Sequence, residues 1–97
     1  MNSEAAGGPP TREFTIVNNR GLHARAAAKF VQTVERFNAA ILVTKDGQSV
    51  GGDSIMGLMM LGAAPGTTVH VAASGDEAEA ALDALEELLR SRFGEDE

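Results

Sequence analysis

The sequence of 97 residues contains no cysteine, tryptophan or tyrosine, only three prolines, and eight basic residues against fourteen acidic ones. Without cysteine, the chain has neither a disulfide framework nor a thiolate metal site. The net charge of −6 and the shortage of aromatic side chains argue against a nucleic-acid-binding protein, which needs a basic face and stacking platforms. No apolar run approaches the roughly 18 residues of a membrane span. No spacing of His, Asp and Glu indicates a metal site or a hydrolytic enzyme.

The order of polar, glycine-rich and apolar stretches predicts one small domain with flanking segments. Residues 1–12 contain Gly7-Gly8-Pro9-Pro10 and lack the basic and apolar regions of a signal peptide, so we expect a disordered leader there. Residues 13–93 are expected to form the domain, since a chain of this length holds a single modest core. Residues 94–97 read as an acidic, solvated tail. A cytoplasmic location is the simplest expectation.

Hydrophobic periodicity predicts four strands and three helices. Asp46-Gly47 is a hairpin signal, and Asp76 with Glu79 three residues later predicts the N-cap and capping box of the last helix. The expected elements are a strand at 13–18, a helix from His23 or Ala24 to about Arg36, strands at 40–45 and 48–51, a helix at 54–61, a strand at 67–73 and a helix after Asp76. The order βαββαβα, with one apolar stripe on each long helix, predicts an α+β domain of two layers.

One of the two histidines, His23, lies where a loop becomes the first helix. A helix N-terminus offers unpaired N–H donors and the positive end of the dipole, so it suits a phosphate. An imidazole is a nucleophile, and Arg25 adds a planar donor fork for phosphate oxygens. The pair therefore indicates a site that takes and releases a phosphoryl group. The alternative interpretation of the same spacing is an exposed histidine on a solvated helix start.

A second segment, Ser54-Ile55-Met56-Gly57, lies downstream of Gly21-Leu22-His23-Ala24-Arg25. In this order and separation the two segments resemble those of the HPr family, the histidine phosphocarriers of the phosphoenolpyruvate-dependent phosphotransferase system. That family carries Gly-Leu-His-x-Arg-Pro-Ala around its phosphorylated histidine and a Ser-Ile-Met-Gly-like segment at the start of a short helix. The resemblance runs from residue 13 to residue 93, nearly the whole chain.

The resemblance implies an HPr-like fold, in which a four-stranded antiparallel sheet is covered on one face by three helices. It also implies a phosphocarrier, not an enzyme, with no cofactor and no metal. Enzyme I would phosphorylate His23 on Nδ1, the pros nitrogen, and a IIA-type protein would accept the phosphoryl group. Arg25 would stabilise the phosphate, and the backbone N–H groups of Ala24 and Ala26 would bind it.

Ser54 has two interpretations that can both hold. It is a natural N-cap for the short helix. In some HPr proteins the matching serine is also phosphorylated by a dedicated enzyme, HPr kinase/phosphorylase, and this weakens exchange at the histidine. Asp53 stands where regulated family members usually have a basic residue, and its charge would repel an incoming phosphate. The sequence leaves the regulatory role of Ser54 open.

The short second helix has more apolar residues than one buried stripe can use. We expect most of them in the core and a remainder exposed beside His23. Ile55 and Met59, one turn apart, match positions where the family docks its partners, and methionine suits a surface that fits several partners. Arg20 adds positive charge to the same surface. The apolar residues concerned are Ile55, Met56, Leu58, Met59, Met60 and Leu61.

One residue departs from the family pattern, and two stretches indicate which branch of the family the chain resembles. Ala26 stands where the family usually has proline. Unlike proline, alanine has a backbone N–H that can donate in the first turn. The run Leu-Met-Met-Leu-Gly-Ala-Ala-Pro-Gly at 58–66 and the acidic ending at 93–97 resemble the nitrogen-related branch, NPr, which serves a regulatory relay. A sugar-transport HPr and a non-phosphorylated binding module of the same fold are the alternatives. The sequence leaves open the identity of the acceptor and the oligomeric state.

Overall fold

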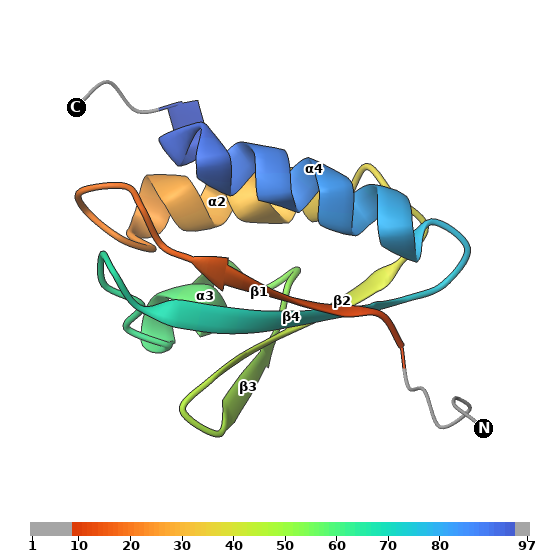
Figure 1. Cartoon of the computed structure of the whole chain (residues 1–97), viewed down its shortest axis with the longest axis horizontal. Coiled ribbons are helices and arrows are strands. Elements are labelled where there is room, and N and C mark those ends of the chain that lie inside the picture. The colour runs from red at the N-terminus through yellow and green to blue at the C-terminus, as the bar shows by residue number, and fades with distance from the viewer. Residues whose placement is uncertain (1–8, 95–97) are drawn as a thin grey trace.

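Four antiparallel strands in the order β1-β4-β2-β3 form a single sheet, and α2 and α4 lie side by side over one of its faces (Figure 1). The computed structural model describes residues 9–94. The elements are β1 (Thr11–Thr15), α2 (Ala24–Val34), β2 (Ala40–Lys45), β3 (Gln48–Gly51), α3 (Ile55–Met60), β4 (Thr68–Ser74), α4 (Ala78–Arg90) and the 3₁₀ turn η1 (Arg92–Gly94). The expected order βαββαβα and the α+β class are confirmed.

Alternation within the strands decides which face the helices cover. In β4, Val69 and Val71 are buried while Thr68 and His70 are exposed, so one face of the sheet is apolar and the other is open. The stripes of α2 and α4 pack on the apolar face, and α3 packs against α2 and β3. The largest fully buried apolar side chains are Phe30, Phe93, Ile16, Leu58, Leu82, Leu85, Val43, Val69 and Val71. Among residues 9–94, no helix has the length and apolarity needed to cross a bilayer.

The first strand, at Thr11–Thr15, begins two residues and ends three residues earlier than the expected 13–18. The carbonyl oxygen of Pro10 accepts a hydrogen bond from Ala73 N–H at 2.9 Å, and Thr11 pairs with Ala72 across the sheet. Arg12 extends from the strand to α4 and forms ion pairs of 2.8–3.0 Å with Glu79, Asp83 and Glu86. The hydrogen bonds that the guanidinium donates to these carboxylates, chiefly the one to Asp83, raise the pKa of Arg12. Residues 1–8 of the expected leader and 95–97 of the expected tail lie outside the described residues.

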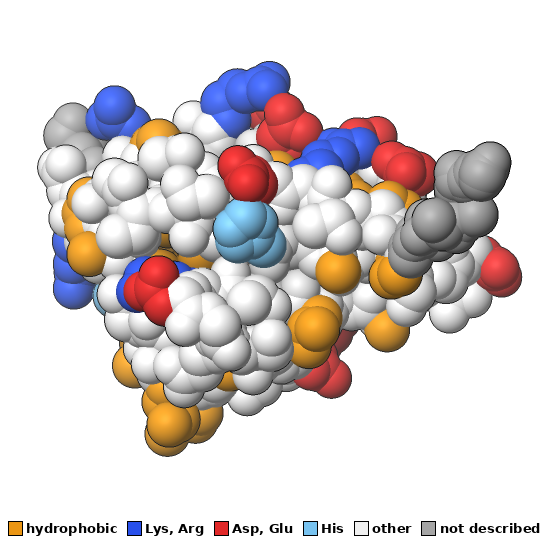
Figure 2. Space-filling model, turned by 60° about the horizontal axis from the view of Figure 1, so that its bottom comes forward, with side chains coloured by type: hydrophobic (Ala, Val, Ile, Leu, Met, Phe, Trp, Pro, Cys, Tyr) orange, Lys and Arg blue, Asp and Glu red, His pale blue; other side chains and the backbone are white. Residues whose placement is uncertain are grey.

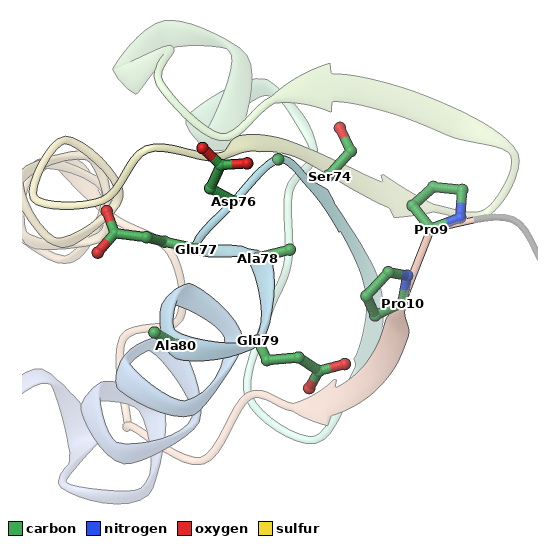
Figure 3. Close-up of a pocket in the computed structure, with 9 residues that line it drawn as sticks. Pro9, Pro10, Ser74, Asp76, Glu77, Ala78, Glu79 and Ala80 are labelled. Carbon is green, nitrogen blue, oxygen red and sulfur yellow. The ribbon is translucent and has the colours of Figure 1, made fainter.

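The expected capping box of the last helix is also wrong. The N-cap is Glu77, and it makes no side-chain cap hydrogen bond. The Glu77 carboxylate instead accepts the Asn38 N–H at 2.7 Å, and Asp76 accepts the Asn38 side-chain amide at 3.4 Å. Glu79 points away from Asp76 and Glu77 (Figure 3) and forms an ion pair with Arg12 at 3.0 Å. Partners from elsewhere in the fold therefore outcompete the local capping pattern.

Candidate functional site

His23 is the N-cap residue of α2, with an extended backbone at φ −78° and ψ 179°. Its carbonyl oxygen accepts the first helical hydrogen bond, from Ala27 N–H at 2.8 Å. The N–H groups of Ala24, Arg25 and Ala26 precede this first helical donor, so they belong to the orphan donors of the helix start. The His23 side chain is half-buried. The imidazole therefore lies at the surface, at the positive end of an 11-residue helix.

The loop before His23 is fastened to the loop that follows α3. Leu22 N–H donates to the Ala63 carbonyl oxygen at 3.0 Å, and the buried Asn18 side chain donates to the Gly21 carbonyl oxygen at 2.8 Å. Gly21 has φ +67°, and a Cβ there would lie only 2.4 Å from the Ala63 oxygen. This close approach needs glycine. Asn18, expected at the end of a strand, and Ala63 were not predicted to position this loop. A polar residue three positions before the turn glycine was the available signal for Asn18.

We predict that Gly21→Ala lowers stability more than Gly62→Ala does. Both glycines have left-handed backbones, at φ +67° and +64°, so either substitution costs about 1 kcal/mol of strain. Only Gly21 meets the Ala63 backbone, whereas a Cβ on Gly62 meets nothing within 4 Å. Thermal melts by circular dichroism measure the difference. Equal melting temperatures for the two variants would show that the loop contact carries no extra stability.

A shallow hollow of about 230 Å³ opens beside His23. Its wall is made by Arg20, Leu22 and His23 on one side and by residues 62–65, which follow α3, on the other. A larger hollow of about 470 Å³ lies at the start of α4, next to Pro9 and Pro10 (Figure 3). The two share no residue, and Figure 1 places the start of α4 at the opposite end of the molecule from the loop before α2. Only the smaller hollow contains a residue of the histidine motif.

The two cationic side chains expected near His23 do lie at this end of the fold. Arg20 lines the same hollow as His23, and Arg25, in the first turn of α2, is exposed. Ala26 is completely buried, so it contributes only its backbone to the helix start. Within a chain of net charge −6, this end therefore combines helix-start donors with two guanidinium groups. Such an arrangement can hold a doubly charged phosphoryl group in water.

The second motif lies on α3, whose end leads directly into the hollow at Gly62. Ser54 is the N-cap, and its hydroxyl oxygen accepts the Gly57 N–H at 2.9 Å, as expected. The expectation that most of the apolar residues of this helix are in the core is wrong. Leu58 and Leu61 are buried, whereas the other four are exposed: Ile55 40%, Met56 69%, Met59 41% and Met60 68%. A helix of two turns that packs on one side cannot bury more than a few of its side chains.

The second histidine lies apart from the first. His70 is on β4, half exposed on the open face of the sheet, with its Nδ1 3.5 Å from the Glu13 carboxylate. Within residues 9–94, no group of three or more His, Asp or Glu side chains is arranged to hold a metal ion.

Comparison with known proteins agrees with this geometry. The family model described as the PTS HPr component phosphorylation site matches residues 10–91. The phosphocarrier protein HPr of Pseudomonas aeruginosa is 47% identical over 91% of this chain and 99% of its own length. HPr of Neisseria meningitidis is 49% identical over 89% of this chain and 97% of its own length. The phosphocarrier protein NPr of Shewanella violacea is 38% identical over 87% of this chain and 92% of its own length.

Solved structures show the same fold. The crystal structure of HPr-C-His from Thermoanaerobacter tengcongensis superposes with a TM-score of 0.86 at 45% identity, over 91% of this chain and 99% of that chain. The fold and the histidine at the start of α2 are those of a small phosphocarrier that is not an enzyme. The chain belongs to the HPr family of the phosphotransferase system. Its general class of partners is therefore enzyme I and IIA-type proteins.

Proposed function

We propose that this chain is a cytoplasmic phosphoryl carrier that accepts phosphate on Nδ1 of His23 from phosphorylated enzyme I and passes it to a IIA-type acceptor. The observation that carries the proposal is the position of His23 at the N-terminus of α2, beside an exposed Arg25 and inside the segment that matches the family. In each exchange one N–P bond breaks on the donor histidine and one forms on the acceptor histidine. The carrier supplies an accessible imidazole and donors for the phosphate oxygens.

Three parts of the site have separate roles in this proposal. The backbone N–H groups of Ala24 and Ala26, with the helix dipole, stabilise the negative phosphoryl group. Arg25 contacts its oxygens through the guanidinium. Arg20, Ile55 and Met59 form the surrounding docking surface, with the charge at the loop and the apolar groups on α3. Because the hollow at His23 is shallow and open, a partner closes it and excludes water during transfer.

The direct test is incubation with phosphoenolpyruvate and enzyme I. Phosphohistidine is acid-labile and base-stable, so its formation is followed by intact mass after base treatment and by its loss in acid. We expect one added phosphate on His23 and its transfer to a IIA-type protein. Absence of label with every enzyme I would contradict the proposal and favour a binding module of the same fold that is never phosphorylated.

We propose the nitrogen-related relay as the branch. The run at 58–66 and the acidic ending support it, as does the similarity to NPr of Shewanella violacea. The second candidate is a sugar-transport HPr, because relatives named HPr are more similar, at 44% and 49% identity in Xylella fastidiosa and Neisseria meningitidis. Initial labelling rates with a nitrogen-type and a sugar-type enzyme I separate the two. Faster labelling by the sugar-type enzyme would overturn the branch but not the carrier function.

Arg25→Ala is predicted to slow phosphoryl transfer without abolishing it. A charge-assisted hydrogen bond contributes about 1.5–3 kcal/mol, so the rate falls roughly ten- to a hundredfold if the contact forms in the transfer state. Arg36→Ala is the control, since Arg36 is also exposed but lies just beyond the other end of α2, stacked 5.4 Å from Phe37. Rapid-quench labelling measures both. A wild-type rate for Arg25→Ala would remove Arg25 from the site.

Ser54 is a helix cap in the structure, and its regulatory phosphorylation by a serine kinase stays a prediction. Ser54→Asp keeps a capping oxygen and adds a charge to the α3 surface, so we expect wild-type stability and transfer slowed several-fold. Ser54→Ala loses the cap bond to Gly57, so we expect a loss of about 1 kcal/mol of stability with transfer retained. Denaturant melts and labelling rates measure the pair. Unchanged transfer by Ser54→Asp would leave Ser54 as a cap only.

A further inference from the structure

The outer face of α3 is made of four large apolar side chains. Residues 55 and 59, and residues 56 and 60, are one helical turn apart, so the four form one continuous surface. Leu58 and Leu61, on the opposite side of the helix, are 0% and 5% exposed. Apolar side chains gather at the lower left of Figure 2, on the side where Figure 1 places α3. The exposed side chains are Ile55, Met56, Met59 and Met60.

Three of these four side chains are methionines, and their sulfur chemistry sets them apart from the rest of the chain. The sequence has four methionines, of which Met1 is the fourth, and it has no cysteine, tryptophan or tyrosine. The three thioethers of α3 are therefore the only sulfur atoms in residues 9–94. Their residues are 69%, 41% and 68% exposed, in the order Met56, Met59, Met60. Exposure and a free lone pair on sulfur are what a peroxide needs to react.

We propose that Met56, Met59 and Met60 are sites of reversible oxidation by hydrogen peroxide, and that their oxidation weakens partner docking and so slows phosphoryl transfer. This inference rests on the proposed function, since it needs the α3 face to be the docking surface. In the reaction, the thioether sulfur attacks one peroxide oxygen, an S–O bond forms and the O–O bond breaks. The leaving hydroxide takes the proton from the new S–OH group. The sulfur loses two electrons as sulfoxide, and peroxide is reduced to water.

The effect on binding follows from the polarity of the product. A sulfoxide oxygen is a strong acceptor with no donor opposite it in an apolar contact, so burying it against a partner carries a desolvation cost. The fold itself is spared, because Leu58 and Leu61 make the core contacts of α3 and contain no sulfur. Met56 and Met60 are the more exposed pair, so they oxidise before Met59. Methionine sulfoxide reductases return all three to the thioether.

The test compares the wild-type chain with a M56L/M59L/M60L variant, each before and after graded hydrogen peroxide. Leucine keeps the face apolar and cannot be oxidised, and both proteins retain Met1 as an internal control for oxidation elsewhere. Peptide mapping locates the added oxygen, circular dichroism follows the fold, and phosphoenolpyruvate with enzyme I measures the labelling rate. Each protein is compared with its own untreated sample. A further wild-type sample is oxidised and then treated with methionine sulfoxide reductases of both epimer specificities.

We expect the oxidised wild type to stay folded, to carry oxygen first on Met56 and Met60, and to be labelled about tenfold more slowly or worse. The reductases restore its rate, and peroxide does not change the rate of the leucine variant. An unchanged rate in fully oxidised wild type overturns the inference, and so does an equal loss in the leucine variant. If the untreated wild type is not labelled at all, the proposed function itself fails. If the leucine variant does not fold, the labelling rate of the oxidised wild type after reductase treatment still tests the inference. A rate that the reductases do not restore would overturn it.

Discussion

His23→Ala should abolish phosphoryl transfer while leaving the domain folded. The imidazole is the proposed acceptor, and alanine offers no nucleophile in its place. The His23 side chain is only half-buried at the start of α2, so its loss should change stability by about 0.5 kcal/mol. Labelling with phosphoenolpyruvate and enzyme I measures transfer, and a thermal melt measures the fold. The expected result is no added phosphate and a melting temperature close to that of the wild type.

The chain provides its own control for this experiment, because it has one other histidine. His70 lies on the open face of the sheet with Glu13 as its neighbour, and neither belongs to the hollow at His23. His70→Ala should therefore be labelled at the wild-type rate. A phosphate on His23→Ala, or the loss of label from His70→Ala, would mean that the acceptor had been assigned to the wrong residue.

Ile55→Glu and Met59→Glu should stay folded and yet transfer phosphate poorly. Both side chains are about two-fifths exposed, so a carboxylate there remains in water in the free protein. In a complex the same carboxylate is desolvated without a partner, and centrally placed interface residues typically contribute more than about 1–2 kcal/mol. We therefore expect the rate with enzyme I, and the rate of transfer to a IIA-type protein, to fall about tenfold or more. The two rates should fall together, since one surface serves both partners.

Two further glutamate variants separate docking from folding. Leu42 is 47% exposed on β2, in the sheet, so Leu42→Glu places the same charge on an equally exposed apolar site outside the α3 face. It should transfer normally. Leu82 is 0% exposed in α4, so Leu82→Glu buries an unpaired charge and should destabilise the domain by about 4 kcal/mol or more. If Met59→Glu melts like Leu82→Glu, or transfers like Leu42→Glu, Met59 is not part of the docking surface.

The sequence predicted the elements well where residues close along the chain stabilise them. The strands at 40–45 and 48–51 have the expected bounds, because alternation and the Asp46-Gly47 turn are sufficient to pair neighbouring segments. The cap at Ser54 was also predicted, since its partner, Gly57 N–H, lies only three residues away. The apolar stripe of α4 was also predicted from spacing, and its buried residues are Ala78, Ala81, Leu82, Leu85 and Leu89.

The errors share a cause, which is competition from partners distant in the sequence. β1 includes Thr11 and Arg12 because they pair with Ala72 and Val71 of β4, about sixty positions away. Asp76 does not cap α4, because its side chain and that of Glu77 bond to Asn38. The partners in such contacts lie too far apart in the sequence to be recognised from the pattern of neighbouring residues.

Some features of the candidate site are likewise encoded by residues close along the chain, and others depend on tertiary contacts. The sequence by itself determined the order of the elements, the α+β class, and the histidine, arginine and serine motifs at the starts of two helices, because caps, turns and apolar periods are encoded by residues close along the chain. Only the tertiary structure brought the loop at Gly21 against Ala63 and opened the hollow between Arg20 and residues 62–65. It also decided that four of the six apolar residues of the α3 segment face solvent. Burial depends on which surface another element covers, and α2 and β3 pack on one side of α3 alone, which leaves the opposite side open to a partner.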